Sequence, residues 1–280
     1  MRGSKTILML SDNPGEDYLA RIRTGASRVC RNAGYMFESV NIYGRSQTIA
    51  EAIAAADCAG FILTPPVSDD RSTLSLLEAR KMPYVRIAPL LDLSRGNVVG
   101  MDEFMAASAV TGLLTARGHT RIGIMRGPNS HLVSMRRYNG YANALGAKGQ
   151  RVDQALVAQG DFTRESGRQQ AAKLFAAKPT AIFASNDEMA AGIMDAARAA
   201  GIAVPQQLSL VGYDDNAVAS TVRPRLTTVR QPLEAMGEEA GKLIVANVVA
   251  PRAACQHIIV PFEIVERDSI ADCPVGLGVT

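Results

Sequence analysis

Short apolar segments alternate along the chain with longer segments in which the apolar residues recur at helical spacing. The short segments predict strands at 6–10, 35–42, 60–63, 84–87, 98–101, 121–125, 155–159, 181–184 and 209–213. The longer segments predict helices near 17–33, 47–56, 70–81, 103–117, 135–149, 164–177, 187–200 and 233–249. The strands are too apolar to lie half-exposed, which indicates parallel sheets with helices on both faces. The predicted fold class is therefore α/β.

The length of the chain, 280 residues, fits two lobes of roughly 120 residues each better than one core. We expect two Rossmann-like lobes, each built on its own parallel sheet. Ligands of such open sheets collect at the carboxyl ends of the strands, so the loops that follow the strands are the natural place for a site. If the two lobes face one another, those loops line one shared cleft.

Composition and charge argue against several classes of protein. A net charge of +3, without a run of Lys or Arg, gives no surface for nucleic-acid phosphates. The four cysteines lack a C-x-x-C spacing, so we expect unpaired thiols, no metal and no cofactor. No apolar stretch is long enough to span a membrane and no export signal is present, which predicts a cytoplasmic location. Residues 1–4 are either a cloning remnant or part of a linker.

Catalytic motifs are missing from the sequence. Its three histidines are scattered, and neither G-x-S-x-G nor H-E-x-x-H nor a phosphate-binding glycine motif occurs. We therefore expect a protein that binds a ligand and is not an enzyme.

A series of motifs in a fixed order resembles one family, the LacI/GalR transcriptional regulators, in their C-terminal effector domain. The motifs are S-D-N-P at 11–14, A-G-F-I-L at 59–63, V-V-G-M-D at 98–102, L-L-T-A-R-G-H-T-R-I-G-I-M-R-G-P at 113–128, R-R-Y-N-G-Y at 136–141, Q-G-D-F-T-R-E-S-G at 159–167, P-T-A-I-F-A-S-N-D-E-M-A-A-G at 179–192, S-L-V-G-Y-D-D at 209–215, P-R-L-T-T-V-R-Q-P at 224–232 and V-E-R-D-S at 265–269. Each is weak alone, but together they are specific and cover nearly all of residues 5–270.

The resemblance implies a periplasmic-binding-protein-like fold of type I, with three chain crossings near 102–103, 230–232 and 250–252. An N-terminal subdomain would comprise residues 5–102 and 232–250. A C-terminal subdomain would comprise 103–231 and 251–270, followed by a tail at 271–280.

The resemblance also implies a role. Regulators of this family carry a helix-turn-helix ahead of this domain, and we expect this sequence to lack it. The chain would then sense a small effector and form a homodimer, and would reach operator DNA only through that absent domain. A periplasmic sugar receptor of a transporter is the alternative, because it shares the two-lobed architecture. A sugar or glycoside is the first choice of effector and a purine-like or acidic metabolite the second, while induction and co-repression both remain open.

Four residues of the C-terminal subdomain are the main candidates for effector contacts. Arg137 matches the family position whose guanidinium grips ligand oxygens, with a surface arginine as the alternative. Asp214 follows an apolar strand and can accept ligand hydroxyls, or else caps a turn. Asn186 offers both a donor and an acceptor, or else caps the next helix. Phe162 matches a position that stacks on the ligand, or else fills the core.

The N-terminal subdomain gives thinner evidence. Tyr18 corresponds to the usual pocket aromatic or else simply opens a core helix. Arg86 lies two residues before Ala88, which replaces a ligand-binding aspartate of some relatives, so a gain of Arg and loss of Asp would favour a different or a more acidic ligand. Three further candidates are Asp102 and Gln231, which lie at expected crossings, and His131.

Overall fold

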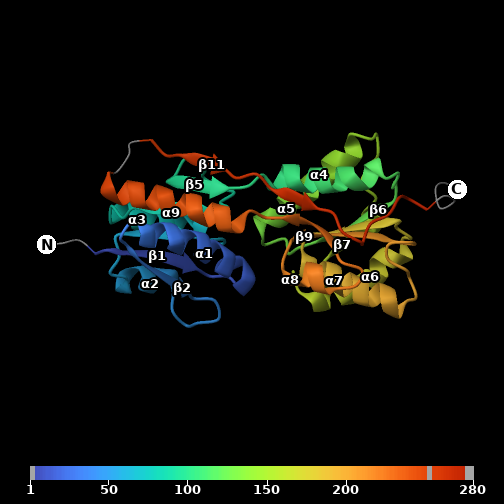
Figure 1. Cartoon of the computed structure of the whole chain (residues 1–280), viewed down its shortest axis with the longest axis horizontal. Helices are drawn as coiled ribbons and strands as arrows, with labels where there is room; N and C mark the ends of the chain where they lie inside the picture. Colours follow the sequence, from blue (N-terminus) through green and yellow to red (C-terminus); the bar gives the residue numbers. More distant parts are fainter. Residues whose placement is uncertain (1–3, 251–253, 275–280) are drawn as a thin grey trace. The chain divides into compact units, whose positions relative to one another are not determined.

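The computed structural model describes residues 4–250 and 254–274, and it divides into two compact units. The first unit takes the chain up to Met101 and the segment Pro232–Pro261. The second takes Asp102–Gln231 and the chain from Phe262 onward. Both units are α/β, and Figure 1 labels their elements along the chain.

The first unit is one parallel sheet with helices against it. Its elements are β1 Thr6–Ser11, α1 Glu16–Asn32, β2 Met36–Asn41, α2 Ile49–Ala55, β3 Gly60–Leu63, the 3-10 turn η1 Val67–Asp69, α3 Arg71–Ala79, β4 Tyr84–Ile87, β5 Asn97–Gly100, α9 Leu233–Val249 and β11 His257–Ile259. The strand order is β11-β5-β4-β3-β1-β2, and every pair is parallel. All residues of β1, β3, β4 and β5 are buried, as expected for strands covered on both faces.

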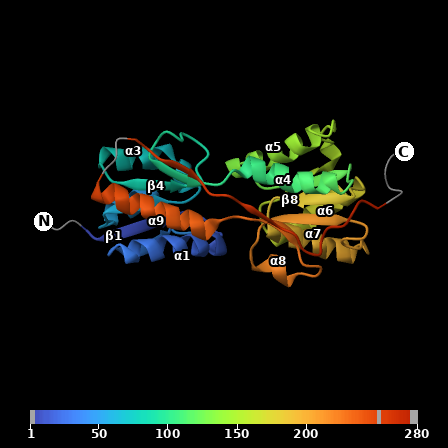
Figure 2. The ribbon, with the colours of Figure 1, turned by 45° about the horizontal axis from the view of Figure 1, so that its top comes forward.

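The helices α1 and α9 pack at very short range because both carry glycine at the contact. A methyl group added at Gly25 would lie 2.0 Å from the Glu234 carbonyl oxygen, and one at Gly237 would lie 2.1 Å from that of Ile22. Figure 2 shows the two helices side by side. Helix α9, which follows the second unit in sequence, therefore belongs to the first.

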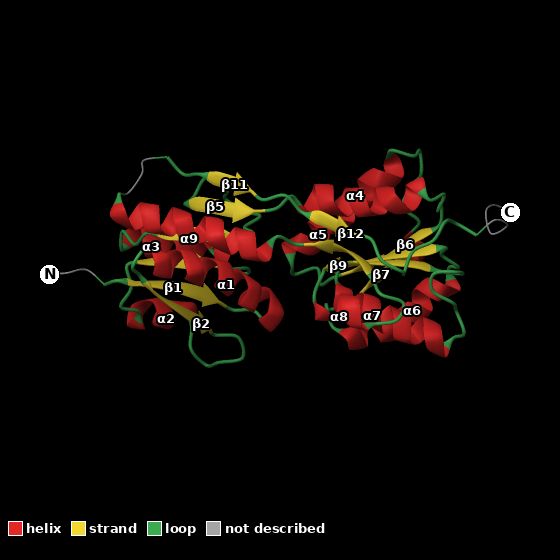
Figure 3. Cartoon of the chain, viewed as in Figure 1, coloured by secondary structure: helices red, strands yellow, loops and turns green. Residues whose placement is uncertain are grey.

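The second unit is also a six-stranded sheet with helices against it, but one of its edge strands is antiparallel. Its elements are α4 Glu103–Ala116, β6 Ile122–Arg126, α5 Leu132–Gly146, the 3-10 turn η2 Gln154–Leu156, β7 Val157–Gln159, α6 Arg164–Ala176, β8 Ala181–Ala184, α7 Asp187–Ala199, β9 Ser209–Asp214, α8 Ala217–Thr221, β10 Thr227–Arg230 and β12 Glu263–Val265. The order is β12-β10-β9-β8-β6-β7, with β12 antiparallel to β10 and the other pairs parallel. Figure 3 shows α4 and α5 on one face of this sheet and α6 and α7 on the other.

The predicted chain crossings differ from the observed ones at the third position. The first two lie at Met101–Asp102 and Gln231–Pro232. The third was expected near 250–252, but β11 pairs with β5, so the chain stays in the first unit until Pro261. Residues 271–274 of the predicted tail are bound to the second unit, because the Cys273 amide donates to the Arg117 carbonyl oxygen at 2.8 Å. Residues 251–253 and 275–280 lie outside the described residues.

Candidate functional site

Arg137, on the second turn of α5, is a buried polar side chain with several partners in the second unit. It is 4% exposed. Its Nε donates to Glu103 Oε2 at 2.9 Å, and its Nη2 donates to Glu103 Oε1 at 3.4 Å. Its Nη1 donates to the Ser185 carbonyl oxygen at the end of β8, at 2.5 Å. The guanidinium therefore joins the start of α4 to the carboxyl edge of the sheet.

Tyr213 completes this arrangement from the end of β9. Its hydroxyl donates to Glu103 Oε2 at 2.6 Å, and the guanidinium carbon of Arg137 lies 3.7 Å from the centre of its ring. A cation over an aromatic face is stabilised by the ring quadrupole. Burial alone would lower the pKa of Arg137, but the nearby Glu103, Tyr213 and Asp214 hold that pKa above its ordinary value. Burial, and then the charge of Glu103, raise the pKa of Tyr213.

Asp214 follows directly and is more accessible, with its side chain 25% exposed. Its Oδ1 lies 3.9 Å from Arg137 Nη1 and accepts a hydrogen bond of 2.6 Å from Gln231 Nε2. Its φ of +112° is unusual for a residue with a Cβ, and such backbone strain clusters at functional sites. Asp215, the next residue, instead binds Arg230 at 2.6 Å and Arg267 at 2.5 Å, which makes it a structural carboxylate.

Asn186 links the end of β8 to a neighbouring loop. Its Oδ1 accepts from the Met189 amide at 2.9 Å, so it caps α7, and its Nδ2 donates to the Phe162 carbonyl oxygen at 2.8 Å. Phe162 has a φ of +71°, and its ring meets His131 edge-on, with the ring centres 5.6 Å apart. Asn186 therefore has the capping role that was its alternative and also fixes the loop that carries the aromatic ring.

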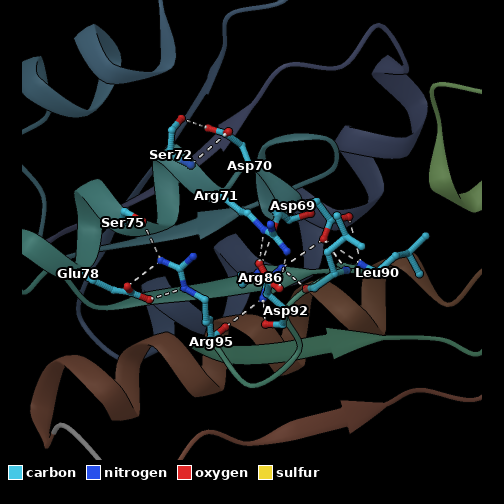
Figure 4. Close-up of polar contacts among 12 residues, drawn as sticks. Asp69, Asp70, Arg71, Ser72, Ser75, Glu78, Arg86, Leu90, Asp92 and Arg95 are labelled. Atoms are coloured by element: carbon cyan, nitrogen blue, oxygen red, sulfur yellow. Dashed lines mark hydrogen bonds and ion pairs between the residues drawn. The ribbon is translucent and has the colours of Figure 1, made fainter.

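Arg86 does not have the role that its sequence position suggested. It is 0% exposed, and all five of its N–H groups have acceptors within the first unit. The acceptors are the carbonyl oxygens of Ser68, Leu91, Asp92 and Arg95 and the carboxylate of Asp69. Figure 4 shows this network, in which Asp69 also receives the amides of Leu90 and Leu91. The prediction of Arg86 as a ligand residue is wrong, because a fully bonded guanidinium has nothing left to offer.

Two further candidates, Tyr18 and Asp102, lie near the starts of helices. Tyr18 is half-buried in the first turn of α1, within the first unit. Asp102 is exposed and caps α4, with Oδ1 accepting from the Met105 amide at 3.0 Å. Asp102 thereby fixes the helix start that carries Glu103. Within the described residues, no group of three or more His, Cys, Asp or Glu side chains is placed to hold a metal ion.

Comparison with known proteins identifies the family. Residues 111–270 match the periplasmic binding protein-like domain. The regulator CelR of Thermobifida fusca is 30% identical over 96% of this chain and 82% of its own length. DegA of Bacillus subtilis is 34% identical over 72% of this chain and 60% of its own length. The chain belongs to the LacI family of transcriptional regulators.

Solved structures agree with this membership of the LacI family. A CelR–cellobiose complex matches with a TM-score of 0.87 and 27% identity, over 96% of this chain and 85% of that one. A LacI-family regulatory protein from Chloroflexus aggregans matches with a TM-score of 0.85 and 26% identity, over 95% and 98%. The fold predicted from the sequence is confirmed. In the part of the chain that the structure describes, no helix is both long and apolar enough to cross a membrane.

Sequence reasoning missed two residues that contact Arg137 in the structure, Glu103 and Tyr213. One available signal was Arg137 itself, because a buried arginine requires an anionic partner. A second signal was the position of Glu103, an acidic residue at the start of a predicted helix and directly after an expected chain crossing. The order of residues along the chain, however, does not say which carboxylate a given guanidinium meets.

Proposed function

We propose that this chain is the effector-sensing region of a LacI-type repressor, with a small polyhydroxylated ligand bound at the carboxyl ends of β8 and β9. The observation that carries the proposal is the spacing of Arg137 Nη1 and Asp214 Oδ1, which lie 3.9 Å apart. Only one of the two Nη1 hydrogens is directed to Ser185. A ligand hydroxyl suits this place, since it can accept from the guanidinium and donate to the carboxylate at the same time.

The neighbouring aromatic rings give the proposed ligand an apolar wall. Phe162 and His131 meet edge-on, and Asn186 holds the loop of Phe162 from the end of β8. A sugar ring has polar edges and a less polar face, so a combination of charged groups and an aromatic ring matches both. The solved CelR complex contains cellobiose, which supports a sugar or glycoside as the ligand class.

The regulatory part of the proposal concerns the whole regulator. The related proteins are helix-turn-helix regulators, so effector binding would alter DNA recognition by such a domain in a cytoplasmic homodimer. The ligand can do this only as far as it binds one conformation more tightly than another. The expectation that the ligand lies in a cleft between the two units stays a prediction.

A thermal-shift titration tests the proposal. The chain is heated with cellobiose, glucose, galactose and ribose, and the variants Asp214→Asn and Arg137→Ala are compared with Arg136→Ala. Arg136 is the exposed neighbour of Arg137 and serves as the matched control. Ligand at about 100 times its Kd stabilises the native state by about 2.7 kcal/mol. We expect a positive shift in the parent and in Arg136→Ala, and its loss in the other two. Equal shifts in all four proteins would contradict the assignment.

A further inference from the structure

Two carboxylates of the protein lie beside Arg137. Glu103 is 7% exposed and accepts hydrogen bonds from Arg137 Nε, Arg137 Nη2 and the Tyr213 hydroxyl. Asp214 adds a second carboxylate on the other side of the same guanidinium. One buried cation therefore stands between two anions.

Glu103 also occupies the part of Arg137 that an acidic ligand would need. A guanidinium recognises carboxylates and phosphates through two parallel N–H groups on one edge. In this protein the edge formed by Nε and Nη2 faces the two oxygens of Glu103, at 2.9 and 3.4 Å. The protein has thus placed its own carboxylate where a ligand carboxylate would bind.

Two arginines near the end of β9, Arg230 and Arg267, are bound to other carboxylates. Arg230 and Arg267 both bind Asp215, at 2.6 and 2.5 Å, and Arg230 also binds Glu263 at 2.6 Å. Arg86, the basic residue that suggested an acidic ligand, is fully bonded within the first unit.

We propose that Glu103 is a specificity-determining residue, which makes the effector site select uncharged sugars and reject their acidic counterparts. This inference rests on the proposed function and adds the charge of the ligand to it. Glu103 acts in two ways: it fills the bidentate edge of Arg137, and its own carboxylate repels an anion placed beside it. A second negative charge at contact distance in a poorly solvated site weakens binding by about tenfold or more.

The experiment compares matched neutral and acidic sugars by calorimetric titration. The pairs are cellobiose with cellobionate, glucose with glucuronate, and galactose with galacturonate. We expect the parent chain to bind the neutral member of the recognised pair at least about tenfold more tightly than the acid. In Glu103→Gln, which removes the charge and keeps the shape, this ratio should fall by about tenfold or reverse.

A matched control separates a local effect from one of total charge. Glu188 lies in the first turn of α7 in the same unit, and Glu188→Gln removes the same charge without touching Arg137, so the parent ratio should persist. The parent measurement tests the inference even if Glu103→Gln does not fold. An acid bound as tightly as its neutral partner would overturn the role of Glu103 and leave the sugar site standing. A parent that binds none of the six sugars would overturn both.

Discussion

Asp187 Oδ1 accepts a hydrogen bond of 2.6 Å from Thr228 Oγ1, and both residues are 0% exposed. The other carboxylate oxygen of Asp187 accepts from the Asn216 amide at 2.9 Å. Glycine is required beside this pair, because a methyl group added at Gly212 would lie 2.2 Å from Asp187 Oδ1. Asp187 therefore ties the start of α7 to β10 and to the strained turn that carries Asp214.

Replacing Asp187 tests this link. Asp187→Ala leaves the buried Thr228 hydroxyl and the Asn216 amide without their acceptor, and each such loss costs about 1–3 kcal/mol of unfolding free energy. Urea denaturation measures the effect. Asp187→Asn keeps the shape and can still accept from one donor, so we expect it to retain more stability than Asp187→Ala. Equal losses in the two variants would contradict this role for the hydrogen bonds.

The same residue predicts a pH dependence. Burial, and then the negative charge of Asp214, raise the pKa of Asp187 above its ordinary value. A raised pKa in the folded state gives stability that is complete below the unfolded pKa, near about 4, and is lost as the pH rises through the folded pKa. Measured against Asp187→Asn, the parent should therefore be relatively more stable at pH 5 than at pH 8. A difference that stays constant or grows with pH would refute the assignment.

The Arg86 network predicts a large loss of stability on neutralisation. Arg86→Met leaves the carboxylate of Asp69 and several loop carbonyl groups without their donor, which should cost about 3–5 kcal/mol. Arg71→Ala is the comparison, because it breaks the ion pair with Asp92 from a side chain that is 71% exposed. That change should cost far less, because water and salt screen an exposed ion pair. Chemical denaturation measures the loss of unfolding free energy in both variants. Similar losses would contradict the prediction that the buried arginine contributes more to stability than the exposed one.

Two glycines of adjacent helices should respond to alanine in opposite directions. A methyl group at Gly140 of α5 would lie 2.3 Å from the Phe104 carbonyl oxygen, so Gly140→Ala must push α4 and α5 apart. We expect a loss of about 1–3 kcal/mol. A methyl group at Gly112 of α4 meets nothing within 4 Å, and Gly112→Ala should gain about 0.5–1 kcal/mol from helix propensity. Melting temperatures that change in the same direction would disprove this contrast.

His119 predicts a loss of stability in acid. The ring is 1% exposed, with Nε2 3.0 Å from the Ala271 carbonyl oxygen and Nδ1 3.0 Å from Thr180 Oγ1. Burial lowers the pKa of His119, so its neutral form gives stability that is present above the unfolded pKa, near about 6.5, and is lost as the pH falls through the folded pKa. The parent should lose more stability between pH 8 and pH 5 than His119→Gln. The exposed His257, changed to Gln, is the control and should follow the parent.

Much of this fold could be predicted because the hydrophobic period of the long segments determines their type of secondary structure. Helix 233–249 was assigned the bounds that the structure gives to α9. The strands β10, β11 and β12 were not predicted, because each is short and lacks a clear apolar run, and each is defined by the strand that it pairs with. The third crossing was misplaced for the same reason.

The candidate site was less predictable than the fold. Arg137 and Asp214 were named from their motifs, and the structure brings them within 3.9 Å of one another. Arg86 had an equally suggestive position but is enclosed by loop carbonyl groups, whose directions depend on backbone turns such as the positive φ values of Ala88 and Asp92. Long-range pairing, as between Arg137 and Glu103, depends on helix packing that no local pattern records.

The edge strands β11 and β12 have a consequence for how the protein is made. The first is an edge strand in the sheet of one unit and the second an edge strand in that of the other, and both come from His257–Val265. A ribosome that has already released every other strand has therefore produced two sheets in which β5 and β10 are still unpaired on one side. Such edges invite association with other chains. Strands β5 and β10 become covered only when one short late segment leaves the exit tunnel, so a nascent chain stalled before it would expose these two strands to aggregation at once.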